Sequence, residues 1–165
     1  ATVDFIKDFV IKSIDDTQIF TQNNITWSKD QNIIVATYIT NERRPNAHLV
    51  LFKNHDGQVI KDINLGAGAY YGVSRDHAFP PVVSPNGQYI AVQTDLIHKI
   101  TIYDFAGNYI TDLPTKYSKV ELFSPEMYAL EDGKYSPFLD YKWSADSKKV
   151  LYRFQGTDRY YEITL

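Results

Sequence analysis

Hydrophobic and polar positions alternate in short runs along most of the chain. Eight segments of six to eight residues mix β-branched or aromatic residues with polar ones, and Asn, Asp, Gly, Pro or Ser separate them. The segments are NIIVATYI, HLVLFKN, QVIKDINL, QYIAVQT, HKITIYD, NYITDL, KKVLYRF and RYYEITL. The nearest helical pattern, over 120–130, is interrupted by Ser124-Pro125, because proline removes a backbone donor. The pattern therefore predicts an all-β chain with one short helical turn.

The chain also repeats itself. TWSKDQNIIVA, VVSPNGQYIAV and KWSADSKKVLY align on Ser28, Ser84 and Ser144, at spacings of 56 and 60 residues. In a second alignment, HLVLFKNHDGQVIKDI from His48 matches HKITIYDFAGNYITDL from His98 at a constant offset of 50. One shorter loop in the second copy reconciles the two alignments. We therefore interpret the chain as three copies of one unit.

Each unit reads as four short strands. In the first unit they are expected near 25–27, 33–39, 48–53 and 58–65. Asp56-Gly57 lies between the last two, and Asp-Gly is a strong hairpin signal because glycine accepts a positive φ. Four-stranded antiparallel units that repeat every ~50–60 residues are typical of β-propeller blades.

The serine hairpins carry a resemblance to known propeller repeats. SPNGQYIAV, WSKDQNIIVATY and WSADSKKVLYRF resemble the W-S-P-D-G-K-x-[IL]-A-[FY] hairpin of TolB-like proteins and of the propeller domain of prolyl-oligopeptidase and dipeptidyl-peptidase enzymes. The first and third copies depart from it, with Lys29 and Gln31, and with Ala145 and Ser147, in place of the Pro and Gly. The resemblance implies an all-β, propeller-like array of about three four-stranded antiparallel blades.

We expect one domain over 1–165. Its parts are N-terminal strands in 1–24, a first blade in 25–65, a second in 81–113 and an incomplete third in 140–165. Three blades are fewer than the four to eight of typical propellers, and we expect exposed apolar sheet faces at the two ends. Three arrangements stay open: part of a larger propeller, half of a six-bladed ring built by a strand-exchanging homodimer, or another arrangement. The segment 1–20 could supply the missing outer strand of a blade.

Composition narrows the classes of function. The chain has 17 Lys and Arg against 20 Asp and Glu, a net charge of −3, which argues against nucleic acid as a partner. It has no cysteine, which excludes disulfides, thiolate zinc sites and cysteine nucleophiles. Its apolar runs are too short to cross a bilayer, so no membrane span is expected.

The candidate binding residues lie in the loops that propellers direct toward their central channel. Two of these loops are long, 66–81 and 114–140, and Tyr and Arg are favoured anchors at binding surfaces. The candidates are Arg43, Arg44, Tyr70, Tyr71, Arg75, Asp76, His77, Tyr128 and Tyr135. Trp27 and Trp143 share a repeat position and are predicted to lie in the core.

No catalytic or metal-binding pattern is complete. Residues 72–76 begin like a nucleophile elbow but lack its final Gly, and the set Asp76, His77, Asp95 and His98 follows no ligand spacing. We therefore expect no enzyme activity, no metal and no cofactor. The predicted function is a non-catalytic binding or scaffold module for a protein or peptide partner. The alternatives are the propeller portion of a serine peptidase whose catalytic domain lies outside this chain, and a carbohydrate-binding propeller.

Overall fold

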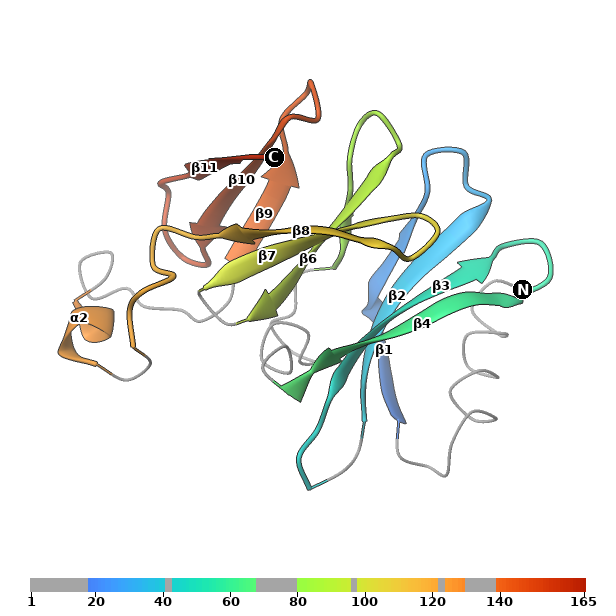
Figure 1. Cartoon of the computed structure of the whole chain (residues 1–165), viewed down its shortest axis with the longest axis horizontal. Coiled ribbons are helices and arrows are strands. Elements are labelled where there is room, and N and C mark those ends of the chain that lie inside the picture. The colour runs from blue at the N-terminus through green and yellow to red at the C-terminus, as the bar shows by residue number, and fades with distance from the viewer. Residues whose placement is uncertain (1–17, 41–42, 68–79, 96–97, 122–123, 130–138) are drawn as a thin grey trace.

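The computed structural model describes residues 18–40, 43–67, 80–95, 98–121, 124–129 and 139–165. Its strands form three antiparallel sheets, which follow one another along the chain (Figure 1). The first holds β1 (Gln18–Trp27), β2 (Ile33–Thr40), β3 (Ala47–Lys53) and β4 (Val59–Gly66). The second holds β5 (Val82–Val83), β6 (Tyr89–Asp95), β7 (Lys99–Asp104) and β8 (Tyr109–Pro114), and the third holds β9 (Leu139–Trp143), β10 (Lys149–Phe154) and β11 (Tyr161–Thr164). A single turn of helix, α2 (Pro125–Tyr128), lies between the last two sheets.

Each strand pairs with its neighbour in sequence, as in a propeller blade. The predicted fold class is therefore confirmed, with strands in the order β1-β2-β3-β4, β5-β6-β7-β8 and β11-β10-β9. The first strand is longer than expected. Gln18–Phe20 pair with Tyr38–Thr40 before a bulge that ends at Ile25, so these residues extend the first blade. Residues 1–17 lie outside the described residues.

The three serine hairpins share one geometry. Ser28 Oγ donates to Asp30 Oδ1 at 2.6 Å and accepts from the Ile33 backbone N at 3.0 Å. The same contacts recur through Ser84, Asn86 and Tyr89 and through Ser144, Asp146 and Lys149. The serine hydroxyl therefore bridges two positions of the turn by hydrogen bonds, and this explains why the motif repeats.

The fourth residue of each hairpin has a positive φ. It is Gly87 in the second hairpin, at 75°, but Gln31 in the first, at 62°, and Ser147 in the third, at 60°. The turn geometry is thus kept in the two copies that lack the glycine, at the cost of a strained side-chain-bearing residue.

The sequence alignment of the first two blades, with its constant offset of 50 residues, is wrong for their third strands. Lys53 lies opposite Ile33, and Asp104 lies opposite Tyr89, so this strand is offset by 51 residues. The cause is the following turn, which has four residues in the first blade, 54–57, and three in the second, 105–107. A one-residue slip moves a side chain to the other sheet face.

Apolar side chains from neighbouring sheets form the core. Val35, Leu49 and Leu51 of the first sheet pack with Ile90 and Val92 of the second. On the other face of the second sheet, residues of β6 and β7 pack with β9 and β10 of the third. This cluster includes Ala91, Ile100, Ile102, Trp143, Val150 and Tyr152. The second sheet is therefore covered on both faces.

The third sheet turns a charged face away from the second. Lys149 stands where β6 has Tyr89, and Glu162 stands where β7 has Ile102. Lys149 Nζ lies 3.0 Å from Glu162 Oε2, and a second ion pair joins Arg153 to Asp140 at 3.2 Å. The expectation of an exposed apolar face at this end is therefore wrong.

The two tryptophans differ, although they share a repeat position. Trp143 is only 7% exposed, donates from Nε1 to the Val82 carbonyl at 2.9 Å and stacks on Tyr89. Trp27 is 43% exposed, so its prediction as a core residue is wrong. Trp143 depends on contacts from the preceding sheet, and no described sheet precedes the one that holds Trp27.

Candidate binding site on the first blade

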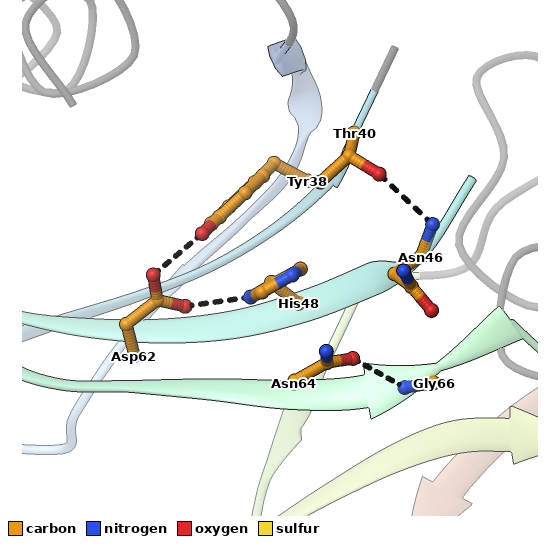
Figure 2. Close-up of polar contacts among 7 residues, drawn as sticks. All are labelled: Tyr38, Thr40, Asn46, His48, Asp62, Asn64 and Gly66. Atoms are coloured by element: carbon orange, nitrogen blue, oxygen red, sulfur yellow. Dashed lines mark hydrogen bonds and ion pairs between the residues drawn. The ribbon is translucent and has the colours of Figure 1, made fainter. Parts of the chain in front are cut away.

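The loop between β2 and β3 has fixed stems. The Thr40 backbone N donates to the Asn46 carbonyl at 2.9 Å, and the Asn46 backbone N donates to Thr40 Oγ1 at 3.0 Å (Figure 2). These bonds close the loop directly after one strand and before the next. The loop therefore projects from a defined base.

Beside this loop, on the strand next to β3, Asp62 of β4 accepts two hydrogen bonds. Tyr38 of β2 donates from Oη to Asp62 Oδ2 at 2.6 Å, and His48 Nδ1 of β3 lies 3.0 Å from Asp62 Oδ1 (Figure 2). The Tyr38 and His48 rings stack with centroids 4.8 Å apart. One carboxylate thus ties together three adjacent strands of the blade.

The electrostatics keep this arrangement fixed. Burial, together with the hydrogen bond to Asp62 and its charge, raises the pKa of Tyr38 far above its ordinary value. The phenol therefore stays neutral and remains a donor at physiological pH. Through these contacts the cluster holds three strands of the first blade together.

Only some of the predicted site residues lie in the described part of the chain. Arg43 and Arg44 do, and both are exposed in the loop between β2 and β3. Tyr128 ends α2, but its side chain is not described. The others lie outside the described residues: Tyr70, Tyr71, Arg75, Asp76, His77 and Tyr135.

His98 contacts two residues near it. Its Nε2 lies 2.9 Å from the Val120 carbonyl oxygen, and its Nδ1 lies 3.5 Å from Asp95 Oδ2. Within the described ranges no group of three or more metal-ligating side chains comes together. Asp76 and His77, the other two residues of that set, lie outside these ranges.

Sequence reasoning missed a hollow between the first two serine hairpins. It measures about 460 Å³ and is lined by Ser28, Lys29, Asp30, Ile33, Asn86, Gly87 and Phe105. A Cβ atom at Gly87 would lie 3.3 Å from the Lys29 side chain, so the glycine makes room for the neighbouring hairpin. The only signal in the sequence is that glycine. The hollow lies at the end of β2 opposite Arg43 and Arg44.

Some solved structures are similar to the fold of this chain. No family model and no curated protein matches the chain. A eukaryotic initiation factor is similar at 15% identity and a TM-score of 0.50, over 91% of this chain and 34% of that one. Hydrazine synthase from Kuenenia stuttgartiensis is similar at 13% identity and a TM-score of 0.51, over 87% of this chain and 45% of that one.

Two further solved structures match the chain at lower TM-scores. TolB from Acinetobacter baumannii is 16% identical with a TM-score of 0.42, over 84% of this chain and 28% of that one. The β-propeller domain of the Trilobed protease from Pyrococcus furiosus is 12% identical with a TM-score of 0.43, over 84% of this chain and 34% of that one. The chain spans less than half the length of each of these four chains. By its sheet order and strand pairing, the described chain has the fold of a partial β-propeller.

None of the described helices is long and apolar enough to cross a membrane.

Proposed function

We propose that the chain is a non-catalytic binding module whose first blade presents Arg43 and Arg44 to a protein or peptide partner. One observation carries this proposal: two adjacent exposed arginines lie in a loop whose stems are hydrogen-bonded between Thr40 and Asn46. A loop with fixed stems loses less conformational freedom when it binds. Because the ends of the loop are held in place, Arg43 and Arg44 are suitable contact residues.

The chemistry of arginine indicates the partner. A guanidinium offers a planar fork of donors that matches a carboxylate, and it stays charged at all physiological pH values. Tyr38 and His48 each lie two residues from the loop stems, Thr40 and Asn46, and both bond to Asp62. We therefore expect an acidic segment in the partner. The tyrosines of the two long loops, Tyr70, Tyr71, Tyr128 and Tyr135, are proposed as further contacts, together with Arg75, Asp76 and His77.

A peptide array tests this function. The array carries acidic, neutral and basic peptides, and the full chain is compared with the Arg43→Glu/Arg44→Glu double variant. We expect the wild-type chain to retain acidic peptides and the variant to lose them. Lys29→Glu is the matched control, because Lys29 is an exposed cation on the opposite end of the first blade.

Equal retention by the wild-type chain and the double variant would remove the loop from the site. Retention of glycans but of no peptide would favour the carbohydrate-binding alternative. Solution mass from light scattering tests the homodimer formed by strand exchange, which predicts twice the mass of one chain. No observation on the described blades favours the peptidase alternative.

A further inference from the structure

The far face of the first sheet, which points away from the second sheet, is buried. Five side chains of β2 and β3 form a cluster there, and each is at most 1% exposed: Ile34, Ala36, Tyr38, Val50 and Phe52. Among the described residues, the one further side chain packed against this cluster is Ile25 of β1, which belongs to the same sheet. A sheet face that packs on nothing leaves its side chains partly exposed. Because these exposed fractions are those of the single chain, another part of the chain covers the face.

In the second blade, the same face meets a neighbouring sheet. Ile34 lies six residues after Ser28, and Ile90 lies six residues after Ser84, so the two isoleucines share a repeat position. Ile90 packs against apolar side chains of the first sheet. The cover on the first sheet therefore occupies the place that a preceding blade would have.

The cover lies over the two central strands. Trp27 stands directly opposite Ile34 and so lies on the same face, yet Trp27 is 43% exposed. Ile25, two residues earlier in β1, is only half-buried. Burial is therefore complete over β2 and β3 and incomplete toward β1.

The sequence of 1–17 fits this place. It leads directly into Gln18, which begins β1 opposite Thr40. Five apolar residues recur at a helical spacing of three or four, with Phe5 and Ile11 flanking them: Val3, Ile6, Phe9, Val10 and Ile14. Charged residues recur at the same spacing on the opposite side: Asp4, Asp8, Lys12 and Asp15. This pattern offers an amphipathic helix as the alternative to the strands expected in 1–24.

The length of this segment also fits. A helix over 3–16 would be ~21 Å long, and the eight residues of β2 extend over ~26 Å. The segment 68–79 is less suited, because it connects β4 to β5 of the second sheet, which packs on the other face of the first. It also contains Gly68 and Gly72, which disfavour a helix.

We propose that residues 1–17, which lie outside the described residues, form an amphipathic helix that covers the far face of the first sheet. Its apolar stripe packs on the cluster of β2 and β3, and its charged positions face solvent. While the helix is in place, neither a further blade nor a second copy of the chain can pack on this face. A six-bladed ring therefore cannot close through it. The proposal does not depend on Arg43 or Arg44.

A spin label locates the segment, because the chain has no cysteine of its own. A nitroxide on Asp8→Cys of the full chain should broaden the methyl NMR signals of Ile34 and Val50 more than those of Ile102 and Val150. The broadening falls steeply with distance, and the second pair lies between the second and third sheets. A nitroxide on Lys148→Cys, in the third serine hairpin, is the matched control and should reverse this order.

Two substitutions in the full chain distinguish a helix from a strand. Val10→Asp places a charge in the apolar stripe and should lower the Tm by about 5 °C, whereas Lys12→Asp, on the charged side, should change it by less than about 2 °C. In a strand, residues 10 and 12 lie on the same face, so the two variants would behave alike. Equal Tm changes in the two variants would overturn the proposal. So would a label at residue 8 that broadens Ile34 and Val50 no more than Ile102 and Val150.

Discussion

At the scale of the residue, the serine turns show how one geometry tolerates different sequences. The Ser28 hydroxyl and the backbone N of Asn32 lower the pKa of Asp30, so the turn of the first blade holds a carboxylate. Asn86 occupies the same place in the second blade and makes the same contact with its serine as a neutral amide. A side-chain oxygen is therefore the requirement at this position, and charge is not.

The positive φ of Gln31 gives the first prediction. Gln31→Gly should raise the free energy of unfolding by about 0.5–1 kcal/mol, because glycine adopts this conformation without steric strain. Ser147→Gly should give no such gain. The Asn86 backbone N donates to Ser147 Oγ at 3.0 Å, and its loss would leave a part-buried donor without this partner. Urea unfolding of both variants checks the contrast, and equal gains would contradict it.

At the scale of the element, the sequence predicted the strands well and one alignment badly. The expected strands at 33–39, 48–53 and 58–65 agree with β2, β3 and β4 to within one residue at each end. Their alternation of apolar and polar residues is strong enough to place them. The His48 and His98 correspondence failed because a turn that is one residue shorter leaves almost no trace in composition, yet it changes the register of a whole strand.

Side-chain partners could not be predicted in the same way. Asp62 and Tyr38 are 24 residues apart, and nothing local in the sequence indicates their bond. The exposure of Arg43 and Arg44 could be predicted, because a loop between two clear strands is visible in the sequence. The charged alternation of Lys149, Arg153 and Glu162 was also visible, but it gains meaning only when the opposite face of β10 is known to be buried.

The tryptophan pair gives a prediction at this scale. Trp143→Phe should lower the free energy of unfolding by about 1–3 kcal/mol, since it removes buried area and leaves the Val82 carbonyl without the indole N–H. Trp27→Phe is the matched control at the same repeat position and should change it by less than about 0.5 kcal/mol. Thermal unfolding with circular dichroism measures both. A large effect of Trp27→Phe would mean that another part of the chain or a partner covers it.

At the scale of the whole molecule, the three sheets differ in how their faces are covered. The second is packed on both faces, and the third ends in ion pairs in place of apolar side chains. In repeat proteins a polar outer face on the last unit keeps the array soluble. The third sheet is the last one described, and its ion pairs give its far face this polar character.

This face gives the last prediction. Lys149→Tyr/Glu162→Ile installs on the third sheet the residues that Tyr89 and Ile102 supply on the second. The variant should associate with itself as its concentration rises, because an exposed apolar sheet face seeks a partner. Light scattering over a concentration series measures this, with Lys148→Tyr as the control outside the face. A mass that does not depend on concentration in the double variant would show that these side chains do not protect the sheet.

The covered second sheet also sets the order in which the molecule opens. The second sheet packs on both faces and the third on one, whereas the far face of the first holds a further buried cluster, Ile34, Ala36, Tyr38, Val50 and Phe52. Local opening should therefore begin in the third blade and reach β6 and β7 last. Amide protons of Ile90, Val92 and Ile102 should exchange with solvent most slowly, at the rate of global unfolding.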